Sequence, residues 1–343
     1  MQDDVPVDTV DCVTQTHDDL DRAASSDGSL AATEPVEAPA LDPSLTAAAR
    51  LHEYSRAANP IGAGITPPVP IRQFSASLHR NATGTAVVDL DVSGELGVAG
   101  PATSPALLAA FVRLTPGDRL DTQPVATSEL YYVLTGSGRS TTGDGLVIPW
   151  GRGDVFVLPA GLAASHDSTD EATLYRVTDE PLLRHLGVAP TERRFEPTLF
   201  RAQDLQDELA RIEATPHARD RSRLSVLLST ADQTRTLTIT HVLWAMYGTV
   251  PAGAVQKPHR HQSVALDLII SAPNGCYTLV GRRLVDGEIV DPVRVEWEAG
   301  GAFITPPGLW HAHHNESGEP AFLLPVQDAG LQTHLVALDI RFS

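Results

Sequence analysis

Three histidines in the second half of the chain have the type and spacing of a metal site. His259 and His261 are two positions apart and precede an apolar, β-prone run, Ser-Val-Ala-Leu-Asp-Leu-Ile-Ile. Residues i and i+2 of a strand point to the same face, so the two imidazoles converge while Arg260 faces away. His311 follows a Pro-Pro-Gly turn signal between two strands. Three neutral imidazoles beside a cation, with open positions opposite, are typical of a catalytic metal centre.

The residues around these histidines form two spaced patterns. A glycine, five residues and His-x-His make the first, with Gly253, His259 and His261. The second pattern is a glycine, five residues, Pro-x-Gly, two residues, His, three residues and Asn. Its members here are Gly300, Pro306, Gly308, His311 and Asn315. Together they resemble the paired signatures of the cupin superfamily, which implies a jelly-roll barrel.

The first pattern departs from the cupin signature at its glutamate, because the candidate positions hold Ala265 and Leu266. The resemblance therefore implies a metal held by three histidines without a carboxylate. A neutral cage leaves the full charge on the metal and favours an anionic bidentate substrate. Fe(II) could take dioxygen beside that substrate, whereas zinc would suit hydrolysis. The geometry alone leaves Fe(II), Zn, Mn, Ni and Cu open.

A narrower resemblance covers the stretches 259–266 and 304–315. They are similar to the corresponding stretches of gentisate 1,2-dioxygenase and its salicylate- and hydroxynaphthoate-cleaving relatives, which are two-barrel cupins with three-histidine Fe(II). The resemblance implies Fe(II) on His259, His261 and His311, with dioxygen as co-substrate. It also implies that His313 supports the metal site or handles a proton. The alternative for His313 is a rim histidine bonded to backbone.

Two features depart from that family. Its members usually carry their iron in the N-terminal barrel, whereas here the histidines lie in the C-terminal half. They also tend to have an arginine, suited to a substrate carboxylate, where this chain has Asp267. By strand parity Asp267 points into the barrel, where it would repel a carboxylate and favour an amine, a guanidinium or a hydroxyl donor. A local arginine such as Arg282 could pair with it instead.

Other side chains are candidates for the pocket. Gln256 and Trp310 flank metal histidines and are predicted to lie near the metal. The remaining candidates, whose aromatic members could equally be core residues, are Trp244, Tyr247, Tyr277 and Gln327. The basic cluster at 219–223 is interpreted as a solvated loop or a salt-bridged interface.

The same two patterns recur in the first half of the chain without their histidines. The scaffold positions are Gly117, Glu129, Gly136, Gly153, Pro159 and Gly161. The metal positions hold Gln123, Val125 and Ala164, and His166 is out of register. Glu129 alone cannot hold a metal, so this copy predicts a barrel that lacks metal ligands.

The chain is therefore predicted to be all-β, with two cupin (double-stranded β-helix) barrels in tandem and a few short helices. Residues 1–45 carry eleven acidic residues against one arginine and are predicted to form a disordered acidic tail. The remaining segments are an extended N-terminal arm (46–106), the first barrel (107–188), a linker with a helix near 199–212 (189–235) and the metal-binding barrel (236–343).

Composition narrows the class of partner. The net charge of −18 argues against nucleic acid or an anionic membrane. There is no apolar run of membrane-spanning length and no secretory signal. Cys12 in the tail and Cys276 in a strand-like run do not suggest a framework disulfide, so a cytoplasmic setting fits. By the cupin resemblance, we expect a homodimer or homotetramer that acts on a small molecule.

Three functional hypotheses follow. The first is a non-haem Fe(II)-dependent dioxygenase that cleaves a small hydroxylated aromatic, or similar bidentate, substrate. The second is another metal-dependent cupin enzyme: an oxygenase on a non-aromatic substrate, or a zinc or manganese isomerase or hydrolase. The third is a cupin that binds a small molecule without turnover. Metal identity and oxygen uptake separate the first two, whereas fold alone does not separate an enzyme from a binder.

Overall fold

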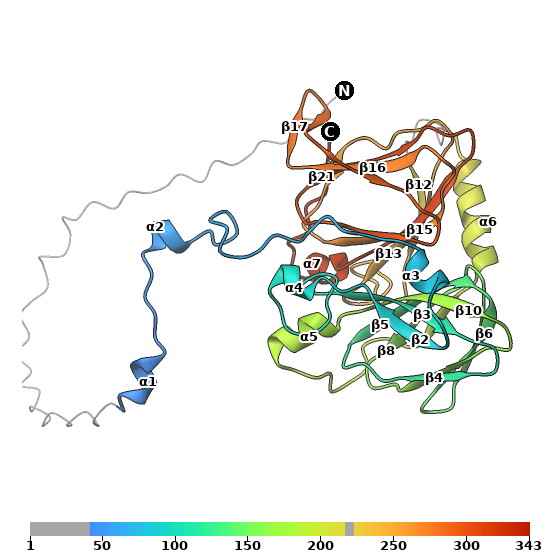
Figure 1. Ribbon diagram of the computed structural model, residues 1–343, viewed down its shortest axis with the longest axis horizontal. Coiled ribbons are helices and arrows are strands. Elements are labelled where there is room, and N and C mark those ends of the chain that lie inside the picture. Colours follow the sequence, from blue (N-terminus) through green and yellow to red (C-terminus); the bar gives the residue numbers. More distant parts are fainter. Residues whose placement is uncertain (1–41, 217–222) are drawn as a thin grey trace, which may run out of the picture. The chain divides into compact units, whose positions relative to one another are not determined.

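The computed structural model describes residues 42–216 and 223–343, and the chain divides into two units, Met1–Ala57 and Ala58–Ser343 (Figure 1). In the first unit, residues 42–57 contain two single-turn helices, α1 (Ser44–Ala47) and α2 (Tyr54–Ala57). The predicted acidic tail, apart from residues 42–45, lies outside the described residues, as does Cys12.

In residues 58–343 the strands build two barrels, each made of two antiparallel sheets, which confirms the all-β prediction (Figure 1). The first barrel combines a sheet in the order β11-β8-β5-β10-β3-β2 with a sheet in the order β4-β9-β6-β7. The second combines β1-β20-β15-β22-β13-β12 with β19-β16-β21-β14-β23. The predicted linker thus supplies β11 to one barrel and β12 to the other, and the predicted arm supplies β1 and β2.

The strands are short, as turn-rich β sequences predict. Those of the first barrel are β2 (Ala86–Asp89), β3 (Leu108–Leu114), β4 (Arg119–Thr122), β5 (Ser128–Thr135), β6 (Ser137–Thr142), β7 (Val147–Gly151), β8 (Val155–Pro159), β9 (Ala164–Asp167), β10 (Ala172–Thr178) and β11 (Thr198–Phe200). Those of the second are β1 (Gln73–Phe74), β12 (Leu224–Leu228), β13 (Trp244–Val250), β14 (His259–Arg260), β15 (Ala265–Ser271), β16 (Cys276–Gly281), β19 (Val293–Glu296), β20 (Ala302–Thr305), β21 (Trp310–Asn315), β22 (Ala321–Gln327) and β23 (Arg341–Phe342). A separate hairpin pairs β17 (Arg283–Val285) with β18 (Glu288–Val290).

Helices connect strands in this unit. They are α3 (Ser77–Arg80), α4 (Ser93–Leu96), α5 (Glu180–Leu186), α6 (Ala202–Glu213) and α7 (Ala329–His334). The helix predicted near 199–212 is α6, which begins three residues later because Leu199 pairs with Phe156 in β11 and β8. Within the described ranges, no helix is long and apolar enough to cross a membrane.

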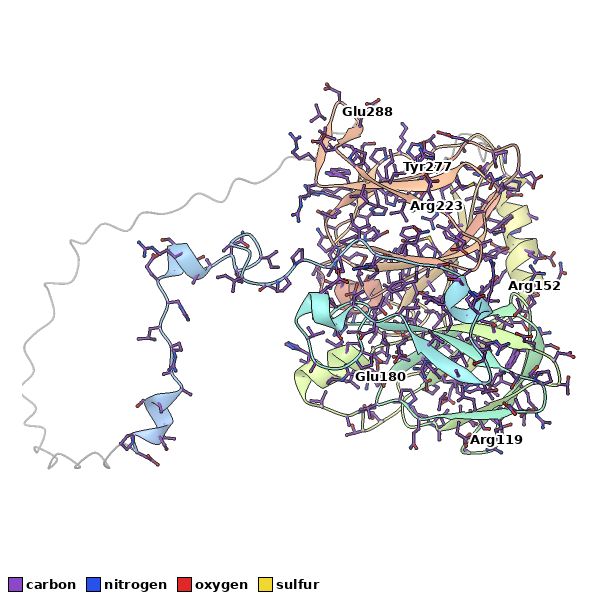
Figure 2. All side chains as sticks on the ribbon, in the orientation of Figure 1. Arg119, Arg152, Glu180, Arg223, Tyr277 and Glu288 are labelled. Carbon is purple, nitrogen blue, oxygen red and sulfur yellow. The ribbon has the colours of Figure 1, made fainter. Side chains whose placement is uncertain are left out.

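Buried side chains form a layer between the two large sheets as well as a core inside each barrel. Phe111 and Tyr175 of the first barrel share one cluster with Leu266 and Leu268 of the second. Separate clusters fill the interiors of the two barrels, and Figure 2 shows side chains filling both. Strands of the large sheets are therefore apolar on both faces, which explains their nearly continuous hydrophobic runs.

A truncation in the shared layer should destabilise both barrels together. Leu268 is fully buried on a central strand, so Leu268→Ala should lower the free energy of unfolding by about 2–5 kcal/mol. Val293→Ala, at a half-exposed position, should cost well under about 1 kcal/mol. Denaturant unfolding followed by near- and far-ultraviolet circular dichroism should show one shifted transition. Two separate transitions, with one unchanged, would contradict a shared core.

Candidate metal centre

Strand pairing brings the three histidines together. β14 pairs with β21 so that His259 lies directly opposite His311, and their ring centroids are 4.0 Å apart. His261 follows two positions later on the same face, with its ring centroid 5.0 Å from that of His311. The turn before His311 is tied to this segment, because the Gly308 N–H donates to the His261 carbonyl over 2.7 Å. Gly308 has φ 73°, a conformation that favours glycine.

Each of these histidines has its Nδ1 beside a backbone carbonyl two residues away in sequence. The Nδ1 of His259 lies 3.2 Å from the Lys257 carbonyl, that of His261 is 2.8 Å from the Ser263 carbonyl, and that of His311 is 3.1 Å from the Leu309 carbonyl. A carbonyl only accepts, so Nδ1 carries the proton and Nε2 keeps its lone pair. Three lone pairs therefore face one region of the pocket, as metal ligands do.

The cluster fits a metal ion. The three candidate ligand atoms lie within 4.8 Å of one another. Ligand atoms that each bond to one cation at about 2.1 Å are about 3–4 Å apart, so a small movement of the side chains would bring these atoms to that spacing. Burial lowers the pKa of His259 to about 3 and that of His261 to about 4, and it lowers the pKa of His311 well below its usual range. The imidazoles are therefore neutral near pH 7, as coordination requires.

His313 lies beside the cluster but is held differently. Its Nδ1 is 2.8 Å from the hydroxyl of Thr278, which also accepts the indole N–H of Trp297 over 2.8 Å. The Thr278 hydroxyl can then donate its hydrogen to His313 Nδ1, which leaves the His313 proton on Nε2. Burial lowers the pKa of His313 well below its usual range, which keeps the ring neutral. Its Nε2–H can therefore donate to a molecule in the pocket.

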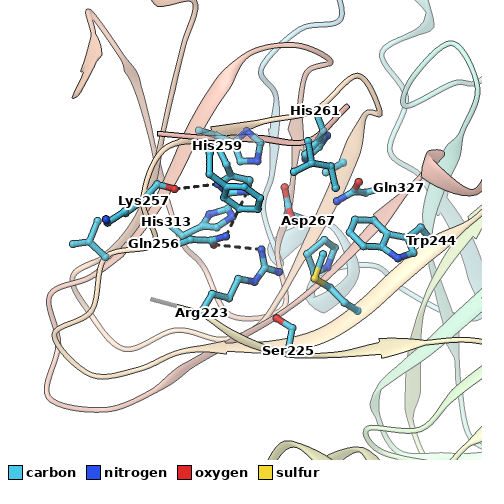
Figure 3. Close-up of a pocket in the computed structure, with 17 residues that line it drawn as sticks. Arg223, Ser225, Trp244, Gln256, Lys257, His259, His261, Asp267, His313 and Gln327 are labelled. Carbon is cyan, nitrogen blue, oxygen red and sulfur yellow. Dashed lines mark hydrogen bonds between the residues drawn. The ribbon is translucent and has the colours of Figure 1, made fainter. Parts of the chain in front are cut away.

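The histidines line a pocket of about 510 Å³ (Figure 3), within the size range of small-molecule sites. Gln256, Asp267 and His313, all predicted site residues, line it as well. Gln256 places its amide nitrogen 3.5 Å from His259 Nε2. Trp244 and Gln327, two of the further candidates, also line the pocket, and its remaining walls are mainly apolar.

Three aromatic candidates lie elsewhere, which corrects the prediction for Trp310. Trp310 adjoins His311 on β21 and therefore faces the opposite side of the strand, where its ring lies under the Arg260 guanidinium at 5.0 Å. Tyr247 faces the layer between the barrels, and Tyr277 stacks on His314 at 4.6 Å. Trp310 was predicted near the metal from its nearness in sequence to His311, and its place on the other face of the strand contradicts that prediction. The two tyrosines were candidates that could equally be core residues, and they do not line the pocket.

Arg223 is a pocket residue that the sequence did not identify. It precedes β12 and points into the space between Gln256 and Asp267 (Figure 3). Its Nη1 lies 3.4 Å from the Gln256 side-chain oxygen, while its Nε and Nη2 are buried without a partner among the described residues. The interpretation of 219–223 as a solvated or salt-bridged cluster is wrong for Arg223, and residues 219–222 lie outside the described ranges.

The alternation of polar and apolar residues from Arg223 onward is a sequence signal that could have identified Arg223 as a pocket residue. Arg223 and Ser225 line the pocket, whereas Leu224 and Leu228 pack in the layer between the barrels. Burial lowers the pKa of Arg223 to about 10, which still leaves it charged at pH 7. The site therefore contains a buried cation with two N–H groups on one edge of the guanidinium, the edge that matches a carboxylate.

Asp267 faces the same pocket, as its parity predicts. The Thr305 hydroxyl donates to it over 2.7 Å. Burial raises the pKa of Asp267 to about 6, against the opposing effects of Thr305 and Arg223. Arg282, the partner suggested by sequence, lines a different pocket. Asp267 thus shares the pocket with Arg223, and the two groups offer opposite hydrogen-bonding character.

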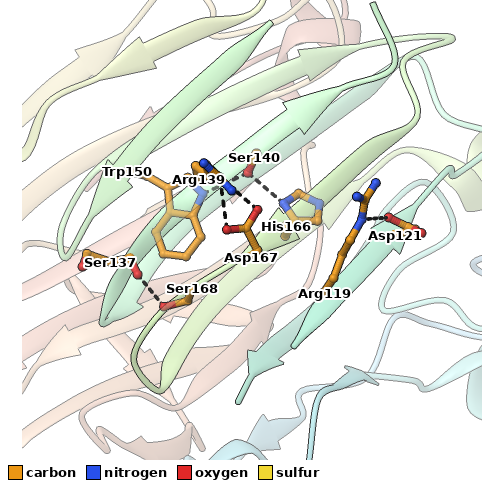
Figure 4. Close-up of polar contacts among 9 residues, drawn as sticks. All are labelled: Arg119, Asp121, Ser137, Arg139, Ser140, Trp150, His166, Asp167 and Ser168. Carbon is orange, nitrogen blue, oxygen red and sulfur yellow. Dashed lines mark hydrogen bonds and ion pairs between the residues drawn. The ribbon is translucent and has the colours of Figure 1, made fainter. Parts of the chain in front are cut away.

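The first barrel contains a polar network where the second has its candidate metal site. His166 is fully buried, with Nε2 2.9 Å from the Thr122 hydroxyl and Nδ1 2.8 Å from the Ser140 hydroxyl, and Figure 4 shows the latter contact beside Trp150. Glu129 accepts the Tyr131 hydroxyl over 2.7 Å. The rings of Tyr131 and Phe156 nearby are stacked, with centroids 4.7 Å apart. These bonds and stacked rings hold the buried polar groups in place.

Comparison with known proteins supports a two-barrel cupin that resembles the gentisate and salicylate dioxygenases. No protein-family model matches the chain. It is 37% identical over 90 residues to 5-aminosalicylate 1,2-dioxygenase from Comamonas sp, covering 26% of this chain and 24% of that protein. It is 31% identical over 150 residues to gentisate 1,2-dioxygenase from Streptomyces sp, covering 39% and 41%. The matched stretches thus span less than half of these relatives.

The fold is similar to a solved structure over a much longer stretch. Salicylate 1,2-dioxygenase from Pseudoaminobacter salicylatoxidans, in its adduct with gentisate, aligns with a TM-score of 0.64 at 12% identity. The alignment covers 85% of this chain and 90% of that structure. This likeness establishes the two-barrel cupin fold.

Removal of the buried acid in the first barrel should change the pH dependence of stability. Burial raises the pKa of Glu129 from 4.5 to about 7. Between these values the native state binds more protons than the unfolded state, so stability falls as pH rises through this window. Glu129→Gln should remove this fall in the free energy of unfolding, which amounts to about 3 kcal/mol at most. Unfolding measured from pH 4.5 to 8, with Glu288→Gln as an exposed control, tests this; parallel profiles for all three proteins would refute it.

Loss of one histidine should abolish metal binding without unfolding the barrel. His259→Ala removes one of the three candidate ligands, so stoichiometric metal should be lost on gel filtration, as measured by elemental analysis. His314→Ala is the matched control, because His314 lies on β21, the strand of His311, but stacks on Tyr277 outside the cluster. Equal metal content in the two variants would exclude this cluster as the metal site.

Proposed function

We propose that this chain is an Fe(II)-dependent dioxygenase that acts on a small aromatic ring carrying adjacent carboxylate and hydroxyl groups. The observation that carries the proposal is the set of three pocket histidines, each with its Nδ1 beside a backbone carbonyl, so that three Nε2 lone pairs converge. The local similarity to the two aromatic-acid dioxygenases favours iron among the metals that such a site can hold.

In this proposal His259, His261 and His311 hold the iron. When bound, Fe(II) would act as a Lewis acid and would relay electrons from the substrate, which is oxidised, to dioxygen, which is reduced. The protein's own contribution is to position the substrate and exclude water. The apolar walls formed by Trp244, Met246 and other lining residues strengthen polar contacts in the pocket.

Arg223 is proposed to bind the substrate carboxylate. Its Nε and Nη2 are buried donors without a partner among the described residues, and a buried cation without an anion is costly. A carboxylate would satisfy both donors in a bidentate pair. This proposal revises the inference, drawn from Asp267 alone, that the pocket disfavours a carboxylate.

Asp267 and His313 are proposed to bind the polar groups on the substrate ring. Asp267 is suited to accept a hydrogen bond from a ring hydroxyl or amino group. The Nε2–H of His313 can donate to an oxygen of the bound substrate and hold it in one orientation. A ring with an anion at one side and a hydrogen-bond donor at the other would match this pair of opposite groups.

The other expectations stay predictions. They are the cytoplasmic setting, the homodimer or homotetramer, and the bounds of the tail, arm, barrels and linker. The alternatives of another metal-dependent enzyme or a non-enzymatic binder are separated from the proposal by oxygen uptake.

The proposal is tested by reconstituting the protein with Fe(II) under anaerobic conditions and then measuring oxygen uptake. Gentisate, salicylate and 5-aminosalicylate should be compared with hydroquinone, which is gentisate without its carboxylate. We expect uptake that depends on iron, is absent in His259→Ala and is greatest with a carboxylated ring. Stoichiometric zinc in the purified protein, with no oxygen uptake after iron loading, would refute the dioxygenase.

Arg223→Gln should weaken binding of carboxylated substrates selectively. Loss of a bidentate charged contact should raise the KM about 10- to 100-fold, or about 1.4–2.7 kcal/mol, with iron content unchanged. Arg294→Gln is the control, because Arg294 stacks on Tyr277 outside the pocket at 3.4 Å. Equal KM values for the Arg223 variant and the unmodified protein would show that the carboxylate binds elsewhere.

A further inference from the structure

The segment after α7 runs back to β14, the strand that carries His259. α7 ends at His334, and Val336 then turns the chain with φ 56°. β-branched residues rarely adopt this left-handed conformation, and the Val336 side chain is 93% exposed, so packing does not enforce it. The turn is held instead by hydrogen bonds from the Ala337 and Leu338 N–H groups to the Gln332 carbonyl.

Beyond this turn, residues 337–343 form what we call the strap. The strap adds β23 to the edge of the sheet, with Phe342 opposite His259 and Arg341 opposite Arg260. Two further hydrogen bonds attach it: the Ser343 N–H donates to the Pro258 carbonyl over 2.9 Å, and the Asp339 N–H donates to the Gln262 side chain over 2.7 Å. The strap is therefore held by a short ladder and few side-chain contacts.

The attachment includes a repulsive pair. Arg341 and Arg260 are directly opposite each other, and like charges at such positions weaken strand pairing. Arg341 forms an ion pair with Asp339 at 2.5 Å, and Arg260 lies over Trp310. Each arginine thus interacts with a residue other than the arginine it faces, and neither interaction strengthens the pairing of β14 with β23.

The inner face of the strap forms part of the pocket wall. Ile340 and Phe342 both line the pocket, as alternate residues of a strand do. The Phe342 ring stacks on the His259 ring, with centroids 5.8 Å apart and planes 18° apart. Phe342 is nevertheless 69% exposed, so it covers a metal histidine from the solvent side without belonging to the core.

We propose that the strap is a cover over the metal pocket, hinged at Val336, that must lift from β14 before a metal ion or a substrate reaches the histidines. The proposal rests on the metal site of the proposed function. Weak pairing, the Arg260–Arg341 repulsion and the unfavourable backbone at Val336 all make the closed position easy to leave. Phe342 is the strap residue that covers the metal site, because its ring stacks on the His259 ring.

A reversible lock tests the cover directly. In the variant with Arg260→Cys and Arg341→Cys, the opposed Cα atoms would be about 4.5–5.5 Å apart, within disulfide range. Both side chains alternate with the pocket-facing residues, so the lock leaves the pocket clear. Zinc is used as the probe, because it is not altered by the oxidant, and its release to an excess of a colorimetric chelator is timed.

The oxidised double variant should release zinc about ten-fold or more slowly than its reduced form, a difference of about 1.4 kcal/mol. Reducing agent should restore the rate. Phe342→Ala should release zinc faster than the unmodified protein. The single variant Arg341→Cys, treated with the same oxidant, controls for other thiol chemistry and should be unaffected.

Failure of the cover and failure of the metal site would give different results. Stoichiometric zinc with equal release rates in the oxidised and reduced double variant would overturn the cover and leave the metal site standing. No zinc bound by the unmodified protein would overturn the metal site of the proposed function and the cover with it.

Discussion

The antiparallel pairing of β14 with β21 is the contact on which the candidate site depends. It sets His259 opposite His311, and the Gly308 N–H bond to the His261 carbonyl ties the intervening turn to the same segment. A shift of one residue in this pairing would turn a histidine away from the pocket. Because backbone hydrogen bonds determine the spacing of the Cα atoms, the imidazoles need only local carbonyl contacts to align their Nε2 atoms.

The first barrel packs against the sheet of the second barrel that forms one wall of the pocket. In β15, Ala265 and Asp267 face the pocket, while Leu266 and Leu268 pack in the layer shared with the first barrel. The sheet behind the pocket is thus covered on its other face by a second folded sheet, which keeps water from it. The interior of the first barrel is occupied by its own polar network around His166 and Glu129, with Tyr131 linking the acid to the aromatic stack.

Burial determines the electrostatics of the pocket. It keeps the three histidines neutral and raises the pKa of Asp267. It leaves Arg223 charged, with two N–H groups that have no hydrogen-bond partner among the described residues. In a chain of net charge −18, this pocket presents a cation to incoming molecules. The strap adds an apolar wall to the same space, so polarity and access are controlled by different parts of the chain.

The sequence by itself determined the fold class, the positions of the three histidines and the inward direction of Asp267. These features follow from local spacing, because the two-residue period of a strand assigns side chains to faces without knowledge of the partner strand. The patterned glycines and prolines mark the turns in the same local way. Parity also argues against Trp310, although nearness in sequence to His311 had suggested a place in the site.

Only the tertiary structure decided which distant residues complete the pocket. Arg223 lies 36 positions before His259 in the printed sequence, and its place depends on β12 joining the edge of the second barrel's large sheet. Phe342 reaches His259 only because the chain turns at Val336 and pairs with β14. Such contacts depend on which strands become neighbours in a sheet. That choice follows from the packing of the whole unit and leaves no fixed spacing in the sequence.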